Sequence, residues 1–570
     1  MIENPTVIDF FCGAGGFSEG FKQQGFDIIL GIDNWQPAID TFNHNFNLSC
    51  SLKNILDFEN SYEEIERLPD SDVIIGSPPC VSFSHSNNSG KANKESGIRL
   101  TKVFLRIVAV KKFKRNSILK AWYMENVANS KNYISDYYTF KDLDLTEWAQ
   151  KNRLSPSKKA IVFKNNQHIV CSADYGSPQK RKRIISGELI HLGYLPIPPT
   201  THADSSIDKK MNKYRDLKFI KDKLPSPTET RTSKSIQDPL YEDIILPINQ
   251  LTDHFYDTGL YESEWRQSRH LKINHPYMGK MSFPEKNDSP SRTITATKIG
   301  TSREAIIYLS EYNRKGNGEY RTPTVREASS IMGFPITFQF KGSEGIKWRL
   351  VGNAVCPTIS SAFAKQLRTE LNLNALYKPI VNLNANIEGI PNLNNFSEKL
   401  FINPPRRIYK SRFRRHPFKD GNITVTLSNY NIEKNTKNIK KWRTSVQYGN
   451  GEGFPTYSYP DTFYSKLEPI IKNFTKGEEF VDFIKNGFSK KIGTSGQLQE
   501  MFELQNSINN LLEPTRLIEE IAFIINNLNL EKEDFCQIEI KVFKKKDTVP
   551  LKQVFALYAI NFISSTANNK

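Results

Sequence analysis

The stretch that decides the fold is TVIDFFCGAGGFSEGF, at residues 6–21. Residues 6–11 are a largely apolar run of strand length that leads directly into a glycine-rich turn, and a helical pattern begins at Phe17. Glycine lets the backbone turn tightly and approach a ligand closely. A strand, a glycine turn and a helix predict the first unit of a nucleotide-binding sheet, with a Gly-x-Gly-Gly spacing that differs from a dinucleotide fingerprint.

The next segments continue this alternation. Residues 27–32 form the second predicted strand, and Asp33 at its end suits either a ribose diol or the N-cap of the following helix. A short third strand is expected to end near Asn54, and further strands are expected at residues 72–75 and 121–124. Repeated alternation of strands and helices predicts a doubly wound α/β domain.

Composition sets the broad class of the protein. A chain of 570 residues should hold roughly two to four domains. Its 78 basic and 61 acidic residues give a net charge of +17, which predicts attraction to a polyanion. The sequence has no apolar run of membrane-spanning length, no export signal and six scattered cysteines without metal-ligand spacing. These features predict a soluble cytoplasmic protein with reduced thiols and an anionic partner.

A second turn carries a candidate nucleophile. The strand at 72–75 leads into GSPPC at residues 76–80, and the prolines stiffen this turn. Cys80 is thereby held at the edge where α/β sheets bind ligands, although a lone cysteine is more often a small buried residue. Glu125 follows the next strand toward the same edge. Arg181 and Arg183, two residues apart on a predicted strand, should point the same way.

Together these motifs resemble the DNA (cytosine-5) methyltransferases, over residues 5–372. The motifs that carry the resemblance, in order, are the glycine turn, the Pro-Pro-Cys turn, ENV at 125–127, QKRKR at 179–183, SRTIT at 291–295, RTPTVREA and GFP within 321–335, and GNAVCP at 352–357. The resemblance implies a Rossmann-like methyltransferase domain that uses S-adenosyl-L-methionine, with a smaller target-recognition domain.

The chemistry of this family explains the catalytic candidates. Cytosine C5 becomes nucleophilic only after a thiolate adds to C6, and an ordinary thiol with pKa about 8.5 needs help to ionise. The resemblance implies that Cys80 is the nucleophile, that Glu125 donates to N3 of the base, and that Arg181 and Arg183 support both. The target base must be flipped out of the duplex, and the flexible stretch at 84–91 resembles the family's mobile catalytic loop.

The resemblance also implies a cofactor site and no metal. Its candidate residues are Phe11, Gly13 and Gly15 around the methyl donor, Asp33 at the ribose, Asn54 near the adenine, Pro79 beside the methionine part, and Asn353 and Val355 in the last motif. Three positions depart from the family pattern: Val81 stands where Gln is common, Asn54 where Asp is usual, and Asn34 where an aromatic or apolar residue is common.

The resemblance divides the chain into regions. It implies a catalytic and cofactor-binding domain at 1–183, a target-recognition region at 184–290, and a return to the catalytic domain at 291–372. Residues 373–400, rich in Asn and Leu, are expected to form a linker. Residues 401–570 are expected to form an additional α+β domain outside the resemblance.

This additional domain has several local signals. Basic and aromatic residues alternate at 405–416, which suits phosphate contacts with stacking or a solvated basic linker. An exposed strand is expected at 422–427, and helices at 498–527 and 551–562. Glu539 and Lys541 share one face of a predicted strand, as in Mg²⁺-dependent nucleases, although this spacing is common on solvated strands. An accessory DNA-binding or specificity domain is the favoured interpretation.

We therefore expect a DNA cytosine-5 methyltransferase that acts on double-stranded DNA, as a monomer, and protects DNA from a partner restriction endonuclease. Three alternatives stay open. A bifunctional enzyme would carry a fused nuclease, a non-catalytic DNA-binding regulator would lack the intact residues Cys80 and Glu125, and a tRNA methyltransferase would not need the long interval between Arg183 and Ser291.

Overall fold

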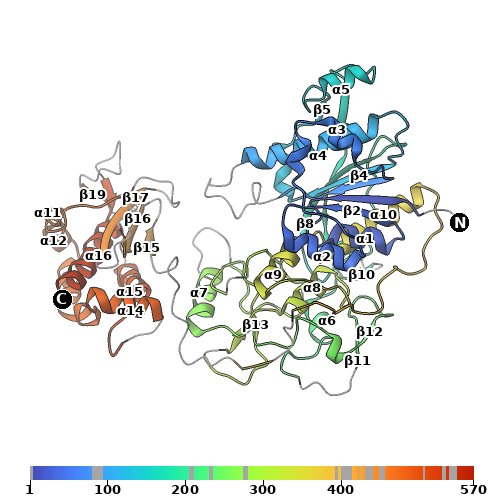
Figure 1. Ribbon diagram of the computed structural model, residues 1–570. Helices are drawn as coiled ribbons and strands as arrows, with labels where there is room; N and C mark the ends of the chain where they lie inside the picture. The colour runs from blue at the N-terminus through green and yellow to red at the C-terminus, as the bar shows by residue number, and fades with distance from the viewer. Residues whose placement is uncertain are drawn as a thin grey trace. The chain divides into compact units, whose positions relative to one another are not determined.

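The chain forms two compact units, residues 1–399 and 400–570, which are described separately here (Figure 1). The computed structural model describes residues 4–79, 94–204, 211–229, 235–273, 280–298, 300–316, 318–391, 396–398, 414–420, 423–430, 441–448, 456–504, 508–528, 530, 535–537 and 548–570.

The first unit is built on a six-stranded sheet with the order β2-β1-β3-β4-β8-β7. The strands are β1 (Thr6–Phe10), β2 (Asp27–Ile32), β3 (Val73–Gly76), β4 (Ala121–Asn126), β7 (Gln167–Cys171) and β8 (Lys182–Leu189). β2, β1, β3 and β4 pair in parallel, whereas β8 runs antiparallel to both β4 and β7. The carboxyl ends of the four parallel strands therefore meet at one edge.

Both faces of this sheet are buried, because successive side chains of a strand point to opposite faces. Val7 and Val73 belong to one apolar core, and Ile8 and Ile74 belong to another. Helices α1 (Gly16–Gln23) and α10 (Pro357–Glu370) contribute to the first core, and α3 (Tyr62–Arg67) and α4 (Lys94–Phe113) cover the other face (Figure 1). The prediction of a doubly wound α/β fold is confirmed.

One predicted strand of this unit is wrong. Asn54 does not end a third strand but caps the 3-10 helix η1 (Ile55–Phe58), where its Oδ1 accepts a hydrogen bond from the Leu56 N–H at 3.0 Å. An asparagine side chain that accepts from a nearby backbone N–H favours a turn over an extended ladder. α2 (Gln36–Phe46) precedes this turn and packs Phe42 against the β2 glycine, Gly31.

The remainder of the first unit has short elements. They are η4 (Ala128–Tyr133), β5 (Tyr137–Thr139), α5 (Thr146–Lys151), β6 (Lys159–Val162), η5 (Ser172–Tyr175), β9 (His202–Ala203), β10 (Asn212–Lys213), α6 (Leu217–Lys221), β11 (Ser235–Gln237), β12 (Ile245–Pro247), η6 (Ile248–Gln250), α7 (Glu262–Ile273), β13 (Tyr308–Leu309), β14 (Tyr320–Arg321), α8 (Val325–Met332) and α9 (Glu344–Asn353). The part of this unit between β8 and α10, residues 190–356, is called the irregular region below. Buried ion pairs support it, with Arg321 to Glu327 at 2.8 Å and Lys347 to Asp253 at 2.5 Å.

The segment after α10 is attached to the first unit. Its described residues, 373–391 and 396–398, contain no helix or strand. The Ile380 N–H donates to the Gln23 carbonyl at 2.8 Å, His44 Nε2 lies 2.7 Å from the Asn386 carbonyl, and Lys378 pairs with Asp243 at 2.7 Å. The expected linker therefore contacts α1, α2 and the irregular region.

The second unit contains an antiparallel sheet and a group of helices. Its sheet is formed by β15 (Arg415–Asp420), β16 (Ile423–Ser428), β17 (Arg443–Tyr448) and β18 (Thr456–Tyr457); the other elements are α11 (Asp461–Tyr464), α12 (Leu467–Lys472), α13 (Gly477–Asp482), the π-helix η8 (Phe483–Gly487), η9 (Phe488–Lys491), α14 (Ser495–Leu504), α15 (Pro514–Asn527), β19 (Phe535–Gln537), β20 (Thr548–Pro550) and α16 (Leu551–Asn569).

The sequence patterns predicted the positions of several elements in this unit correctly, but they did not predict which residues are buried. The helices expected at 498–527 and 551–562 are confirmed as α14, α15 and α16. The strand expected at 422–427 exists as β16, but its expected exposure is wrong, because all six of its residues are buried. Among the residues that the structure describes, no helix is both long and apolar enough to cross a membrane.

The close approach of α1 to the segment before α10 yields a stability prediction. A Cβ on Gly16 would lie 2.2 Å from the Val355 carbonyl oxygen, whereas a Cβ on Gly345 in α9 would have no atom within 4 Å. We expect Gly16→Ala to lower the free energy of unfolding of this unit by about 1–3 kcal/mol, because backbone must shift. Gly345→Ala should raise it by about 0.5–1 kcal/mol. Urea unfolding of both variants checks this, and equal stabilities would contradict it.

The attached segment yields a second prediction. A chain that ends at residue 398 keeps the contacts of Ile380, Lys378 and Asn386, and a chain that ends at residue 372 loses them. We expect the longer fragment to unfold at the same urea concentration as the first unit of the full chain. The shorter fragment should be less stable by about 1–3 kcal/mol, since each hydrogen bond contributes about 1 kcal/mol. Coincident unfolding curves for the two fragments would contradict this.

Candidate functional site

The candidate site lies at the edge where three neighbouring parallel strands end. β1 ends at Phe10 and leads into the glycine turn, β3 ends at Gly76 and leads into the Pro-Pro turn, and β4 ends at Asn126, directly after Glu125. The parallel register pairs Phe10 with Gly76 and Gly76 with Met124. Three sequence motifs that are far apart in the chain are therefore brought together.

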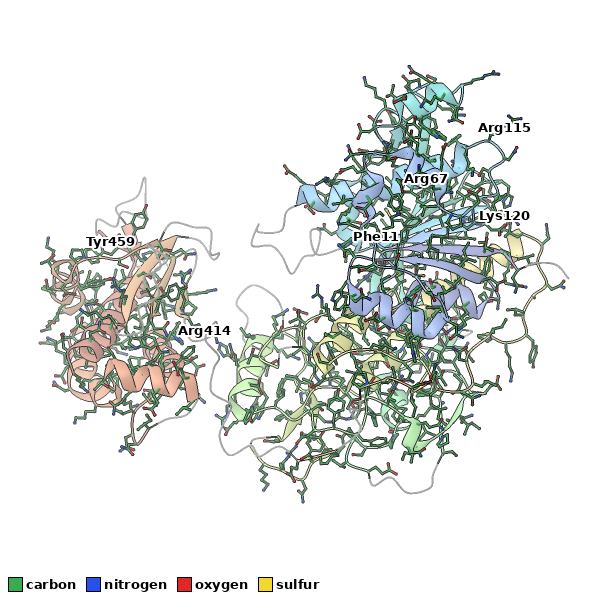
Figure 2. The ribbon with its side chains drawn as sticks, in the orientation of Figure 1. Phe11, Arg67, Arg115, Lys120, Arg414 and Tyr459 are labelled. Atoms are coloured by element: carbon green, nitrogen blue, oxygen red, sulfur yellow. The ribbon has the colours of Figure 1, made fainter. Side chains whose placement is uncertain are left out.

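The glycine turn is held in an unusual backbone conformation. Phe11, Gly13 and Gly15 all have positive φ, of 58°, 52° and 95°. This conformation is easy for glycine but strained for a bulky residue, and such strain is concentrated at functional sites. Among the described residues, a Cβ on Gly13 would have only the Phe11 carbonyl oxygen nearby, at 4.0 Å, so these residues leave space beside the turn. Figure 2 shows Phe11 inside the first unit and Arg115 at its periphery.

Asp33 connects the second strand to this turn. Its Oδ2 accepts a hydrogen bond from the Gly13 N–H at 3.0 Å, and its Oδ1 accepts from the Trp35 N–H at 2.9 Å. The N-cap of α2 is Trp35, so Asp33 does not cap that helix. Burial raises the pKa of Asp33, and the backbone N–H donors of Gly13 and Trp35 oppose that shift. A carboxylate has lone pairs for further donors, so a ligand hydroxyl can still bind here.

Glu125 and Arg183 form a buried ion pair. Arg183 Nε lies 2.9 Å from Glu125 Oε1, and the two side chains are 11% and 9% exposed. Burial raises the pKa of Glu125, and the positive charges of Arg183 and Arg181 oppose that shift. The carboxyl group therefore holds a proton more readily than an ordinary glutamate, which suits a proton donor.

Arg181 joins separate parts of the unit. Its guanidinium donates hydrogen bonds to the carbonyls of Ile294 at 2.8 Å, Gly352 at 3.1 Å and Ala354 at 3.1 Å. These carbonyls belong to the two late motifs of the sequence. Arg183 is the arginine with the direct ion pair to Glu125, whereas Arg181 fixes the backbone behind it.

The Pro-Pro turn is tied to both neighbouring motifs. The Ser77 N–H donates to the Phe10 carbonyl and the Ser77 hydroxyl to the Phe11 carbonyl, both at 3.2 Å. On the other side, Asn126 Nδ2 donates to the Pro78 carbonyl at 3.1 Å. Sequence analysis missed Asn126, although its position directly after Glu125 was a usable signal. Cys80 and the expected loop at 84–91 lie outside the described residues.

The other cofactor candidates lie around the glycine turn. The Val355 carbonyl oxygen lies against Gly16 at the start of α1, since a Cβ on Gly16 would be only 2.2 Å from it. Pro79 and Asn353 are exposed. The side-chain Oδ1 of Asn54 already accepts a hydrogen bond from the Leu56 N–H but keeps a second lone pair.

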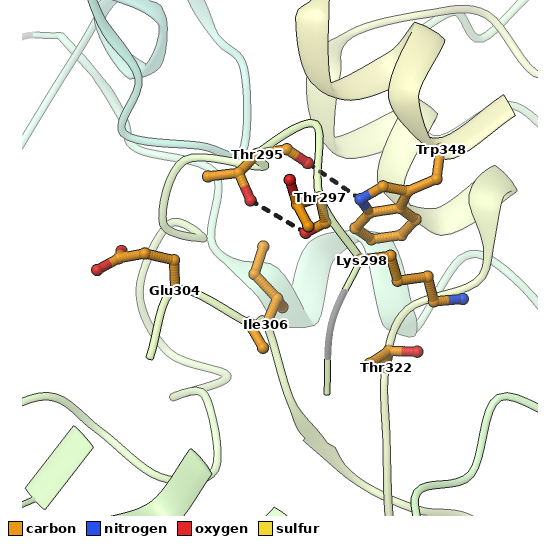
Figure 3. Close-up of a pocket in the computed structure, with 8 residues that line it drawn as sticks. Thr295, Thr297, Lys298, Glu304, Ile306, Thr322 and Trp348 are labelled. Atoms are coloured by element: carbon orange, nitrogen blue, oxygen red, sulfur yellow. Dashed lines mark hydrogen bonds between the residues drawn. The ribbon is translucent and has the colours of Figure 1, made fainter. Parts of the chain in front are cut away.

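A small hollow is lined partly by the segment that follows Ile294, whose carbonyl accepts from Arg181 (Figure 3). Thr295, Thr297 and Lys298 line one side, and Trp348 of α9 lines another. Trp348 Nε1 donates to the Thr295 carbonyl at 3.0 Å, and Lys298 pairs with Glu344. Lys298 and Trp348 were not among the predicted residues, because no local pattern indicates that they meet.

Cys12, Cys50, Cys171 and Cys356 are free. Within the described ranges, no cluster of three or more His, Cys, Asp or Glu residues could hold a metal ion. Glu539 and Lys541, the pair considered for a nuclease, lie outside those ranges.

The chain is similar to known methyltransferases. The type II methyltransferase M.MthTI of Methanothermobacter thermautotrophicus is 25% identical over 376 residues, which cover 65% of this chain and 98% of that protein. The type II methyltransferase M.HgiGI of Herpetosiphon aurantiacus is 36% identical over 127 residues, covering 22% of this chain and 92% of that protein. The crystal structure of the S. pombe Dnmt2 methyltransferase has a TM-score of 0.41 and 16% identity, covering 65% of this chain and 100% of that one.

The family model of the C-5 cytosine-specific DNA methylases matches residues 5–369, more than half of the chain. This match confirms the resemblance seen in the ordered motifs. The chain belongs to the C-5 cytosine-specific DNA methylase family and is a DNA (cytosine-5-)-methyltransferase.

Proposed function

We propose that this enzyme uses S-adenosyl-L-methionine to methylate cytosine C5 in a specific sequence of double-stranded DNA, through a covalent bond between Cys80 Sγ and C6. The observation that supports this most is the buried ion pair of Glu125 and Arg183. It lies at the sheet edge where β3 leads toward Cys80 and β1 leads into the glycine turn.

Each catalytic candidate has a defined task. The Cys80 thiolate adds to C6, and negative charge develops on the ring toward N3. Glu125, whose pKa is raised by burial, gives its proton to N3 and thereby stabilises the adduct. Arg183 orients the carboxyl group, and Arg181 holds the segments behind it. Once C5 is methylated, water takes the C5 proton and the Cys80–C6 bond breaks with its electron pair returning to sulfur. The N3 proton returns to Glu125, which restores the aromatic ring.

The residues around the glycine turn fit the proposed cofactor, whose role when bound is to supply an electrophilic methyl group. The described residues leave space beside Gly13, and Asp33 has acceptor capacity left for a ribose hydroxyl. Phe11, Gly15, Pro79, Asn353 and Val355 complete the proposed site. Asn54 can still accept from an adenine amino group with its remaining lone pair.

The wider role is proposed from the relatives. M.MthTI and M.HgiGI are type II methyltransferases, which supports a role in protecting DNA from a partner restriction endonuclease in a prokaryotic cytoplasm. Residues 184–290, whose described part beyond β8 contains α7 and several shorter elements, are the proposed target-recognition region. Residues 1–183 and 291–372 are the proposed catalytic parts, and we propose that the enzyme acts as a monomer.

The nucleophile can be tested by substitution. We expect Cys80→Ser to reduce methyl transfer by several orders of magnitude, because a hydroxyl ionises far less readily than a thiol. It should also abolish the denaturant-stable complex with duplex DNA that contains 5-fluorocytosine, whose fluorine blocks release of the base. Binding to unmodified DNA should persist. Cys171→Ser, at a half-buried thiol elsewhere, is the matched control. A stable complex formed by the Cys80→Ser protein would overturn the assignment.

The ion pair makes a prediction about pH. In the unaltered enzyme, the positive charge of Arg183 opposes the effect of burial on the pKa of Glu125. Removing this charge with Arg183→Gln should therefore raise that pKa further. If protonated Glu125 is the active form, the loss of single-turnover methyl transfer at high pH should move to higher pH in this variant. The maximal rate should also fall, since the carboxyl group loses its orienting partner. Arg183→Lys keeps the charge, so the pH at which activity is lost should hardly change in that variant. A shift of this pH to a lower value in Arg183→Gln would contradict the proposal.

A further inference from the structure

The sheet of the second unit has two chemically different faces. Ile423, Val425 and Leu427 of β16 belong to the apolar core that includes α16. The alternate residues of β16, Thr424 and Thr426, must therefore lie on the opposite, outer face.

The register of the sheet identifies the rest of this outer face. Arg415 of β15 and Arg443 of β17 both pair with Ser428, and Lys419 of β15 pairs with Thr424. The outer face comprises Arg415, Pro417, Lys419, Thr424, Thr426, Ser428, Arg443, Ser445, Gln447 and, from β18, Thr456. Among these residues, Pro417 is the one apolar side chain, and none is acidic. This composition is unsuited to a hydrophobic protein interface and suited to a polyanion.

The cations stand around a polar centre. Five residues of this face are 3% exposed or less, namely Thr424, Thr426, Ser428, Ser445 and Gln447. Lys419 is exposed, and Arg415 and Arg443 are half-buried. Arg415 donates to Gln447, and Thr426 shares a hydrogen bond with Ser445 at 2.6 Å. A large ligand would therefore meet the cations at the edges, while the hydrogen-bonded centre fixes their spacing.

The spacing of these cations matches a long anionic ligand. Arg415 and Arg443 are two strand spacings apart, about 10 Å, and Lys419 is four residues along β15 from Arg415, about 13 Å. Duplex DNA carries about one charge per 1.7 Å of its axis, so this span covers several phosphates. Burial and the positive charge of Arg415 also lower the pKa of Lys419, as expected where like charges are held close together.

The sequence that precedes β15 carries further positive charge. Between residues 400 and 414 there are five Lys and Arg residues and no Asp or Glu: Arg406, Arg407, Lys410, Arg412 and Arg414. We propose that the outer face of β15, β16 and β17 binds the phosphate backbone of duplex DNA, so that the second unit holds the substrate of the methyltransferase without reading its sequence. This inference rests on DNA as the substrate class of the family, not on the proposed catalytic residues.

The test measures DNA affinity of the full chain in the absence of cofactor. The variant carries Arg415→Gln, Lys419→Gln and Arg443→Gln, and the matched control carries Lys466→Gln, Lys476→Gln and Lys490→Gln, which remove the same charge from exposed positions in the helical part of the unit. We expect the first variant to lose about tenfold or more in affinity at low salt, equally for several duplex sequences. The slope of log affinity against log salt should fall by about 2–3, since each lost phosphate contact removes about 0.9. The control should change affinity less than about twofold.

Two additions keep the result interpretable. A variant with Lys419→Gln and Arg443→Gln retains the hydrogen bond of Arg415 to Gln447 and should show an intermediate loss. A variant with Arg415→Lys and Arg443→Lys should recover most of the affinity. Equal losses in the variant and the control would overturn the proposal, and so would a loss of affinity for duplex RNA alone. Because binding is measured without methyl transfer, failure of the covalent mechanism would leave this result unaffected.

Discussion

Parallel pairing of β1, β3 and β4 is the constraint on which the rest of the catalytic unit depends. It aligns the ends of three strands that together span more than a hundred positions of the chain, from Phe10 to Asn126. Hydrogen bonds then lock the three connections to each other, through Ser77 to Phe10 and Phe11 on one side and Asn126 to Pro78 on the other. The side chains at this edge need little movement to act together, which is what positioning for covalent catalysis requires.

Buried charge at this edge has a cost that the fold offsets locally. Removing a carboxylate and a guanidinium from water is unfavourable unless each finds good partners. Arg183 meets Glu125, and Arg181 meets three backbone carbonyls from the two late motifs. One basic motif therefore serves two purposes, because it tunes the pKa of Glu125 and also fixes the return of the chain after the irregular region. The irregular region itself relies on similar pairs, such as Lys347 with Asp253.

Local signals made much of this fold predictable. The strand, glycine turn, helix and second strand of residues 6–32 each have their own periodicity, and the structure has them in that order. Asn54 could not be placed in the same way, because a capped turn and a strand end share the same residue type. The burial of β16 was missed because it depends on what covers each face, which is not local. The contacts of Arg181 and the meeting of Lys298 with Trp348 depend on the long path between residues 190 and 350, which no pattern encodes. The roles of Cys80, Glu125 and the cofactor candidates remain predictions from the resemblance.

The second unit extends the family architecture with a separate sheet whose polar face is cationic. If the first unit modifies cytosine in one sequence, DNA that meets the enzyme must carry methylated cytosines in that sequence. Bisulfite sequencing of DNA from cells that express the chain measures this methylation most directly. The account predicts cytosines that resist conversion within one short recurring sequence and that convert in cells without the chain. Complete conversion in both kinds of cell, with the protein expressed and folded, would contradict it.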